Sequence, residues 1–360
     1  MFTSIDAVWM ARALELAQHG LYTTHPNPRV GCVMVLYGDV VGEGWHRKAG
    51  EPHAEVLALE QAGERARGAT VYVTLEPCSH HGRTPPCAEA LIAAQVGRVV
   101  IAAPDPNPLV NGQGIEKLRA AGIHVDTGLK QAEAEALNAG FIKRMSQGLP
   151  LVRVKLAASL DGRTALANGI SKWISGDEAR ADVQHWRARS SAILTGIGTV
   201  LADDPQLTVR GCDIEMTGRQ PIRVICDSQL RTPENARVVA GPDTLIYTTQ
   251  MPQIRGQAQV IQVPAENNKG VDLTLVLRDL AGRGCNEVLV EAGAALSGRL
   301  VELGLVDELI MYVAPVLLGP DARALLQLPL ISEIKNRIEL NLLDSRQFGS
   351  DVRLHYQVKR

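Results

Sequence analysis

The sequence predicts an α/β protein made of two domains. Apolar runs with the period of strands alternate with stretches of helical period along the whole chain. A length of 360 residues suits about two domains, each large enough to bury its own core. Gly148 and Pro150 interrupt the pattern between a helical stretch and an apolar strand. We therefore place the domains at residues 1–147 and 148–360.

The first half opens with an amphipathic helix, because Ala7, Met10, Leu14 and Ala17 recur at helical spacing within residues 5–18. The elements expected after it are a hairpin with strands at 30–36 and 40–45, a helix at 53–66, a strand at 70–75, a helix at 87–94, a strand at 98–103 and a helix at 131–146. Strands that alternate with helices predict a sheet covered on both faces.

The second half repeats the alternation with different motifs. We expect strands at 151–156, 192–195, 222–227, 287–290, 309–313 and 352–358, and helices at 177–188, 273–281 and 296–302. This half contains no G-x-G-x-x-G after a strand, so a standard dinucleotide-binding fold is not supported.

Composition and charge exclude several classes of protein. Hydrophobic residues make up 46% and charged residues 21% of the chain, as in folded globular proteins. Lys plus Arg number 37 against 39 Asp plus Glu, and aromatic residues are only 4%, so nucleic acid is not an expected partner. No apolar stretch approaches the ~20 residues that cross a bilayer, and residues 1–6 do not resemble a signal peptide. We expect a cytoplasmic protein that does not bind membranes.

Six cysteines are few for this length, and a reducing compartment would keep them as free thiols. We expect no disulfides. Those without a partner at metal-binding spacing lie in or beside apolar segments and are expected in the core; they are Cys32, Cys212, Cys226 and Cys285.

One histidine and two cysteines in the first half have the character of zinc ligands. His53 begins an H-x-E motif with Glu55, and Pro77-Cys78 is followed by Cys87. An imidazole and two thiolates suit zinc, and three protein ligands leave a fourth position open for a reacting water. Glu55 is placed to carry protons for that water. The sequence therefore predicts a catalytic zinc site with one Zn²⁺ per chain.

The same residue types form the signature of zinc nucleobase deaminases, in which H-x-E is followed by P-C-x-x-C. Here the cysteines are spaced Cys-x8-Cys, and a longer loop adds little closure entropy. Residues i and i+2 of a helix point to different sides, so His53 and Glu55 have to lie in the first turn. A structural zinc, closed by His80 or His81 as a fourth ligand, is the alternative.

At this point the chain resembles a known family. The segments Thr24–Gly31, Gly44–His46, His53–Glu55 and Thr74–Cys87 look like the deaminase half of the bifunctional riboflavin-biosynthesis deaminase/reductase family (RibD type), which uses the longer cysteine spacing. The segments Lys155–Gly162, Ser171–Ile174, Thr195–Arg210 and Val290–Gly293 look like its reductase half.

The resemblance implies a cytidine-deaminase-like α/β/α zinc domain followed by a dihydrofolate-reductase-like domain. It also implies two reactions on one small-molecule substrate. A diaminopyrimidinone that carries a ribosylamino 5-phosphate loses its ring amino group, and NADPH then reduces the ribosyl chain to a ribityl chain.

The resemblance also assigns individual residues. It implies zinc on His53, Cys78 and Cys87 with Glu55 as the catalytic residue. Substrate contacts in the deaminase half are implied for Asn27, His46, Arg83, Asp105 and Asn107. Cofactor contacts are implied for Ala157, Trp173, Thr199, Asp203, Ser228 and the segment from Gly293 to Arg299. Substrate contacts in the reductase half are implied for Ser171, Arg187, Leu207, Arg210 and Glu291.

Simpler interpretations stand beside three of these assignments. The Asp105-Pro106-Asn107-Pro108 and Asp203-Asp204-Pro205 segments have the composition of plain turns. Arg187 lies on an expected helix, where an arginine is commonly solvated. Arg187 and Arg210 are nevertheless the natural ligands for a phosphate.

Two rival functions stay open at the level of sequence. One is a zinc deaminase of another base or of nucleic acid with a non-catalytic C-terminal domain. The other is a scaffold stabilised by zinc. We expect a homo-oligomer, although no motif specifies its state.

Overall fold

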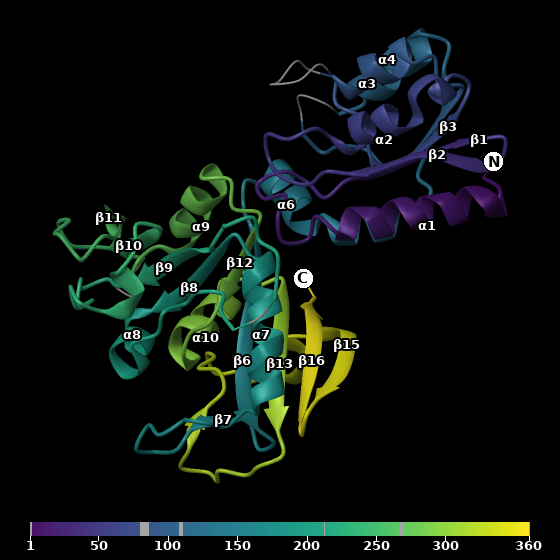
Figure 1. Ribbon diagram of the computed structural model, residues 1–360. Helices are drawn as coiled ribbons and strands as arrows, with labels where there is room; N and C mark the ends of the chain where they lie inside the picture. Colours follow the sequence, from purple (N-terminus) through teal and green to yellow (C-terminus); the bar gives the residue numbers. More distant parts are fainter. Residues whose placement is uncertain (1, 80–85, 108–110, 212, 267–269, 360) are drawn as a thin grey trace. The chain divides into compact units, whose positions relative to one another are not determined.

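The computed structural model describes residues 2–79, 86–107, 111–211, 213–266 and 270–359 (Figure 1). The chain divides into two compact units, unit 1 at Met1–Leu149 and unit 2 at Pro150–Arg360. The boundary expected after residue 147 lies just before this division. Within the described ranges, no helix combines the length and the hydrophobicity needed to cross a bilayer.

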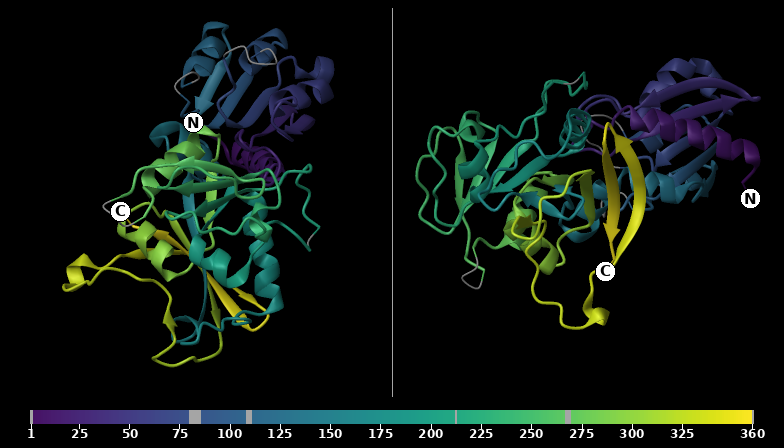
Figure 2. Two further views of the ribbon diagram at one scale, coloured as in Figure 1. Left: turned by 90° about the vertical axis from the view of Figure 1, so that its left-hand side faces the viewer. Right: turned by 90° about the horizontal axis from the view of Figure 1, so that it is seen from below.

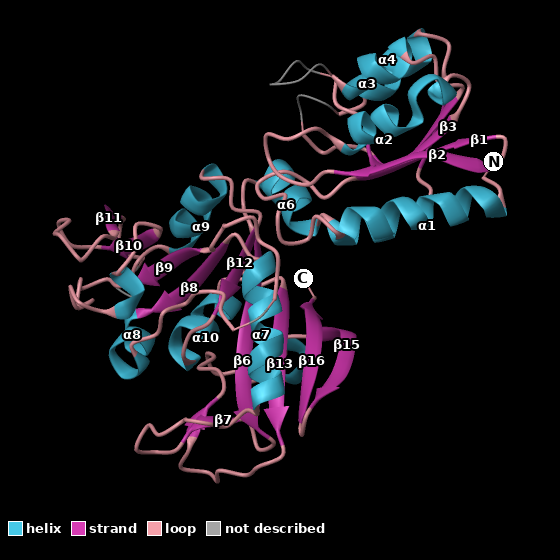
Figure 3. Ribbon diagram, viewed as in Figure 1, coloured by secondary structure: helices cyan, strands magenta, loops and turns pink. Residues whose placement is uncertain are grey.

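Unit 1 is built from one sheet and the helices around it (Figure 3). Its elements are α1 (Ser4–Gln18), β1 (Gly31–Leu36), β2 (Asp39–Trp45), α2 (Ala54–Ala62), a 3-10 turn (Gly63–Ala66), β3 (Thr70–Leu75), α3 (Cys87–Ala93), β4 (Arg98–Ala103), α4 (Gln113–Ala120), β5 (His124–Thr127), α5 (Gln131–Leu137) and α6 (Ala139–Gln147). The strand order is β2-β1-β3-β4-β5. Strand β1 is antiparallel to both neighbours, whereas β3, β4 and β5 are parallel.

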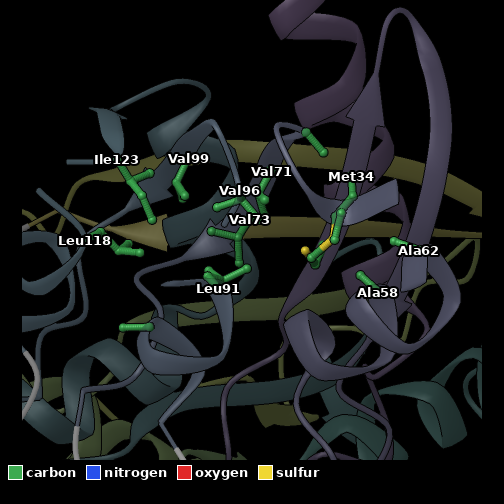
Figure 4. Close-up of a cluster of buried hydrophobic side chains, with 14 of the residues drawn as sticks. Met34, Ala58, Ala62, Val71, Val73, Leu91, Val96, Val99, Leu118 and Ile123 are labelled. Atoms are coloured by element: carbon green, nitrogen blue, oxygen red, sulfur yellow. The ribbon is translucent and has the colours of Figure 1, made fainter. Parts of the chain in front are cut away.

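Hydrophobic clusters on the two faces of this sheet hold the helices. On one face Ala58 of α2, Leu91 of α3 and Leu118 of α4 pack with strand residues such as Met34 and Val73 (Figure 4). The second cluster joins the other helices to the opposite face through Met10 of α1, Ala134 of α5 and Phe141 of α6. The predicted sheet with helices on both faces is therefore confirmed for unit 1.

Two local features of unit 1 differ from the sequence prediction. The helix expected at 131–146 is broken at Asn138, whose φ is −111°. The Asn138 amide accepts a hydrogen bond from the backbone N–H of Arg29 and donates one to the Arg29 carbonyl, so a distant segment fixes the break. Helix α4 and strand β5 were not predicted, because Gly112 and Gly114 give the start of α4 the composition of a loop.

Unit 2 contains a nine-stranded sheet in the order β11-β10-β9-β8-β12-β6-β13-β16-β15. Its elements are β6 (Leu151–Ser159), β7 (Arg163–Ala165), α7 (Asp177–Arg189), β8 (Ala192–Gly196), α8 (Ile197–Asp203), β9 (Ile222–Cys226), a 3-10 turn (Arg237–Val239), β10 (Thr244–Thr248), β11 (Gln259–Gln262), α9 (Leu273–Gly282), β12 (Glu287–Val290), α10 (Ala294–Glu302), β13 (Glu308–Ala314), β14 (Arg323–Ala324), a 3-10 turn (Ile334–Asn336), β15 (Leu340–Phe348) and β16 (Asp351–Val358). Seven neighbouring strands, from β11 to β13, are parallel. The antiparallel hairpin β15–β16, yellow in Figure 2, closes one edge.

Helices cover both faces of the parallel part. Trp186 of α7 packs against Leu289 and Ile310, and Val200 of α8 belongs to a cluster with Ile246 of β10. The next residue of β10, Tyr247, points to the opposite face and donates a hydrogen bond to Asp279 of α9. In such a sheet, ligands bind beyond the carboxyl ends of the strands.

The sequence prediction missed the short elements β7, α8, β10, β11 and β14 of unit 2 and the nine-residue strand β15. Nearly every residue of β15 is exposed, so this strand lacks the alternation that marks a half-buried strand.

Candidate active sites

Three side chains with metal-binding atoms meet in unit 1 where α2 and α3 begin. His53 is the N-cap residue of α2, Cys87 is the first residue of α3, and Cys78 follows β3. Their ligand atoms all lie within 4.8 Å of one another. The Nδ1 atom of His53 is 3.2 Å from Sγ of Cys87 and 3.6 Å from Sγ of Cys78.

These distances fit a tetrahedral zinc ion. Zinc–nitrogen bonds of about 2.0 Å and zinc–sulfur bonds of about 2.3 Å give a nitrogen–sulfur edge of roughly 3.5 Å. The backbone N–H of Cys87 donates to Sγ of Cys78 at 3.3 Å. Hydrogen bonds from Cys87, together with His53, outweigh burial and lower the pKa of Cys78 below its usual value. Cys78 is therefore prepared as a thiolate ligand.

Glu55 lies in the first turn of α2 and only 3% of it is exposed. Burial raises the pKa of Glu55 to about 7, and the nearby His53 limits this rise. A carboxyl group with this pKa can both accept and release a proton near neutral pH. Its place beside the three metal-binding side chains suits a proton carrier.

One predicted substrate contact, His46, lies against this cluster, and a second, Asn27, is bonded to His46. The His46 ring stands edge-on to the His53 ring, with 5.3 Å between ring centres. Nδ1 of His46 is 3.2 Å from the Pro52 carbonyl, and Nε2 is 3.0 Å from Nδ2 of Asn27. Because a carbonyl only accepts, we assign the ring proton to Nδ1, and Nε2 then accepts from the Asn27 amide. Burial lowers the pKa of His46, which favours this neutral form.

Asp105 and Asn107 follow β4. The Asp105 carboxylate accepts the backbone N–H of Asn107 at 2.8 Å, and the backbone N–H of Asp105 donates to Glu76, two residues before Cys78. Asp105 and Asn107 therefore form a local turn closed by a side-chain hydrogen bond, and this turn is tied to the segment that carries a metal-binding cysteine. Pro108, the last residue of the turn expected from composition, lies outside the described residues. Arg83, His80 and His81 lie outside the described residues.

Unit 2 contains a cavity of about 1410 Å³ at the carboxyl ends of β6, β8, β9 and β12. The structure brings all twelve residues predicted for the reductase half to its wall; they are Ala157, Ser171, Trp173, Arg187, Thr199, Asp203, Leu207, Arg210, Ser228, Glu291, Gly293 and Arg299. The volume is large enough for a dinucleotide together with a second ligand, since single-ligand pockets span roughly 300–1,000 Å³.

A two-pronged ion pair lies in the wall of this cavity. Nε and Nη2 of Arg187 donate to the two oxygens of Glu291 at 2.6 and 2.9 Å, and Nη1 donates to the Thr208 carbonyl at 3.0 Å. Arg187 is buried rather than solvated. Burial alone would raise the pKa of Glu291. The pKa nevertheless lies below its usual value, because Arg187 stabilises the charged carboxylate.

Six other cations in the cavity wall had no role assigned from the sequence; they are Lys155, Lys172, Arg180, Arg231, Arg237 and Arg323. Burial lowers the pKa of Lys155, while Glu291 opposes that effect. Lys155 and Arg153 are the two charged residues in the largely apolar run that forms β6, and a charge in such a run was a signal in the sequence that could have identified Lys155.

The start of α10 also opens into the cavity. Gly293 is its N-cap residue and provides no side-chain cap for the first backbone N–H groups, which suits an anionic ligand. Arg299 on the same helix is held by Glu266 at 3.0 Å and Glu302 at 2.7 Å. Asp203 pairs with Lys172 at 3.3 Å on the cavity wall.

Comparisons with known proteins match both units. Residues 150–354 match the family model of the RibD C-terminal domain, and residues 3–103 match that of the cytidine and deoxycytidylate deaminase zinc-binding region. The chain is 52% identical to the riboflavin biosynthesis protein RibD of Escherichia coli strain K12, over 97% of this chain and 98% of that protein. It is 49% identical to RibD of Haemophilus influenzae, over 99% of both chains.

Solved structures resemble the whole chain as well. A structure of Acinetobacter baumannii RibD has a TM-score of 0.92 at 49% identity, covering 99% of both chains. A diaminohydroxyphosphoribosylaminopyrimidine deaminase/5-amino-6-(5-phosphoribosylamino)uracil reductase from Thermotoga maritima has a TM-score of 0.88 at 33% identity, again covering 99% of both chains.

Proposed function

The chain belongs to the RibD family of bifunctional riboflavin-biosynthesis enzymes, and from that premise we propose which residues perform its two reactions and in which order. In unit 1 the ring amino group of 2,5-diamino-6-(5-phosphoribosylamino)pyrimidin-4-one is exchanged for oxygen from water, releasing ammonia. In unit 2 the ribosyl chain of the product, 5-amino-6-(5-phosphoribosylamino)uracil, takes up a hydride and a proton to become a ribityl chain.

The observation that carries the deamination is the meeting of His53, Cys78 and Cys87 beside buried Glu55. We assign the three to zinc, which supplies Lewis-acid activation of a water molecule at neutral pH. Glu55 takes the proton of the attacking water and delivers it to the departing amino group. Its burial in the first turn of α2, beside the three metal-binding side chains, places the carboxyl group for both transfers.

Asn27 and His46 orient the pyrimidine in this proposal. His46, held by the Pro52 carbonyl, fixes the Asn27 amide by accepting from its Nδ2. This orientation makes the Asn27 oxygen the acceptor for an amino group of the ring. Asp105 and Asn107, which follow β4, are the other proposed substrate contacts in unit 1. The backbone N–H of Asp105 donates to Glu76, which lies two residues before Cys78.

In unit 2 we place NADPH and the ribosylamino substrate together in the cavity. The fit rests on its volume, on the α10 N-terminus and on its arginines, which suit the phosphates of both molecules. NADPH supplies the hydride. The guanidinium of Arg187 already makes three hydrogen bonds, two to Glu291 and one to the Thr208 carbonyl. We therefore assign the role of binding the substrate phosphate to Arg210. The role of Arg187 is then to orient Glu291.

We also propose that the enzyme is a cytoplasmic homo-oligomer that does not act on nucleic acid. Exposed leucines on the edge strand β15, Leu340, Leu342 and Leu343, support contact with a second copy. Light scattering of the purified chain tests the oligomer, and a monomer at micromolar concentration would contradict it. Salt-dependent binding of single-stranded nucleic acid would instead favour the rival deaminase function.

The experiment that tests the proposed function follows NADPH oxidation by the full chain, with and without removal of zinc by a chelator. Supplied with the aminated substrate, the zinc-loaded enzyme should oxidise NADPH and the zinc-free enzyme should not. Supplied with the deaminated compound, both should oxidise NADPH at the same rate. Oxidation of the aminated substrate by zinc-free enzyme would reverse the proposed order, and no oxidation with either compound would refute the assignment of unit 2.

A further inference from the structure

Glu76 has a buried carboxylate for which the proposed chemistry gives no role. It follows β3, two residues before Cys78, and is 3% exposed. Its backbone N–H donates to the Ala103 carbonyl at the end of β4. Both strand ends that lead into the deaminase site are thus joined at this residue.

The carboxylate of Glu76 accepts four backbone hydrogen bonds from two different segments. Oε2 accepts from the N–H of Asp105 at 3.3 Å and of Gly112 at 3.0 Å. Oε1 accepts from the N–H of Gly114 at 3.0 Å and of Ile115 at 3.3 Å. The first donor lies in the turn that follows β4, and the other three belong to the start of α4.

Helix α4 depends on this contact because it has no cap of its own. Its N-cap residue, Gly112, is left-handed with φ of 83° and offers no side chain. The first N–H groups of a helix lack partners within the helix, and a carboxylate from outside satisfies them while favouring the positive end of the helix dipole.

Helix α4 also packs against the segment Pro77–Ser79, which contains Cys78 and which we call the metal loop. A side chain at Gly114 would place its Cβ 2.1 Å from the Pro77 carbonyl, so α4 lies directly on the residue before Cys78. One turn further along, Nζ of Lys117 donates to the Ser79 carbonyl at 2.7 Å and to Glu89 of α3 at 3.1 Å. Helix α4 therefore contacts the chain on both sides of Cys78.

We propose that Glu76 is a positioning residue for deamination, which holds the Asp105–Asn107 turn in fixed register with the metal loop through α4. It does not touch the substrate. It sets the distance between one group of proposed substrate contacts and the reacting centre, where small displacements are costly. The inference rests on the proposed function, since it takes Asp105 and Asn107 to bind substrate.

The substitution Glu76→Gln tests this role. A glutamine offers one oxygen, so its NH₂ group has to face two of the four N–H donors. Lys117 anchors the α4 side to Ser79 and Glu89, so we expect the Asp105 side to move. In the full-length enzyme, KM for ammonia release from the aminated substrate should rise at least tenfold. The kcat should stay within threefold, with one zinc per chain, because the metal-binding residues and Glu55 keep their places.

Hydrogen exchange supplies the structural readout, and Glu60→Gln is the matched control because Glu60 is exposed on α2. In the Glu76→Gln variant, hydrogen exchange should accelerate in the peptide that contains Asp105 and Asn107. In the Glu60→Gln variant, no peptide should exchange faster than in the wild type. Faster exchange throughout unit 1, with KM and kcat altered together, would indicate a merely structural role and overturn the proposal. An unchanged KM at full zinc content would also overturn it.

Two further measurements keep the proposal falsifiable if Glu76→Gln does not fold. In the wild type, the amides of Gly112, Gly114 and Ile115 should exchange slowly, although they start a helix; fast exchange would refute the network. Asn107→Ala tests the underlying substrate contact. If Asn107→Ala leaves KM unchanged, the proposed contact between Asn107 and the substrate is wrong. If Asn107→Ala raises KM but Glu76→Gln does not, the substrate contact stands and only the role of Glu76 is refuted.

Discussion

Arg187 holds Glu291 with two hydrogen bonds, of 2.6 and 2.9 Å, in the wall of the unit 2 cavity. Both side chains are about nine-tenths buried. A paired guanidinium and carboxylate in such a place keep each other charged, and the planar fork fixes the direction in which the carboxylate points. The orientation of the Glu291 carboxylate in the cavity is therefore set by Arg187, which lies on helix α7.

Replacing Arg187 by methionine should damage reduction and destabilise unit 2 together. Breaking a buried pair leaves an unpaired charge, at a cost of about 3–5 kcal/mol. We expect reductase kcat to fall, the stability of unit 2 to drop by that amount and ammonia release to stay unchanged. Arg346→Met, at an exposed arginine on β15, is the control and should change stability by less than about 0.5 kcal/mol. Equal effects of the two substitutions in urea unfolding would contradict the buried-pair argument.

Glu55→Gln should separate zinc binding from deamination. The amide keeps the size of the side chain but cannot carry the proton, so kcat for ammonia release should fall by about 10²–10⁴. Zinc content and the reduction of the deaminated compound should stay at wild-type values. Glu60→Gln, on the exposed side of the same helix, should have no effect. Loss of zinc in Glu55→Gln, measured by elemental analysis, would make Glu55 a ligand instead of a proton carrier.

The sequence predicted the fold class and the chemistry, because both depend on local pattern. The two-domain α/β architecture and the deaminase and reductase families are confirmed by the matched family models and the related structures. The spacing of His53, Cys78 and Cys87 pointed to zinc, and the structure brings the three together. The bounds of many strands differ from the prediction by only a few residues.

What the sequence could not provide are roles that arise from contacts between distant segments. The break at Asn138 depends on Arg29, and the start of α4 depends on Glu76. Arg187 looked like a solvated or phosphate-binding arginine until its three bonds to Glu291 and Thr208 were seen. Each of these partners lies far away along the chain, so neither local secondary-structure propensity nor hydrophobic periodicity could predict the contact.

Acid should destabilise unit 2 through Glu308. Burial alone would raise the pKa of this carboxyl group, but Arg153 and His355 lower it to about 2. A lowered pKa in the folded state means that the stabilisation is fully present above the unfolded value of 4.5 and is lost as pH falls from there towards 2. The shift corresponds to about 3 kcal/mol. Urea unfolding between pH 2.5 and 6 should show Glu308→Gln losing less stability on acidification than the wild type. Parallel curves would contradict this assignment.

Arg210 should contribute to substrate binding in reduction alone. It lines the cavity, and burial together with the nearby Arg187 lowers its pKa, so an incoming phosphate would relieve a local excess of positive charge. Arg210→Ala should raise KM for the deaminated compound about tenfold, equivalent to about 1.4 kcal/mol of binding. Arg210→Lys should restore part of the loss, because lysine keeps the charge without the planar fork. Arg278→Ala, at an exposed arginine on α9, should leave KM unchanged. An equal rise of KM for deamination in Arg210→Ala would contradict separate sites in the two units.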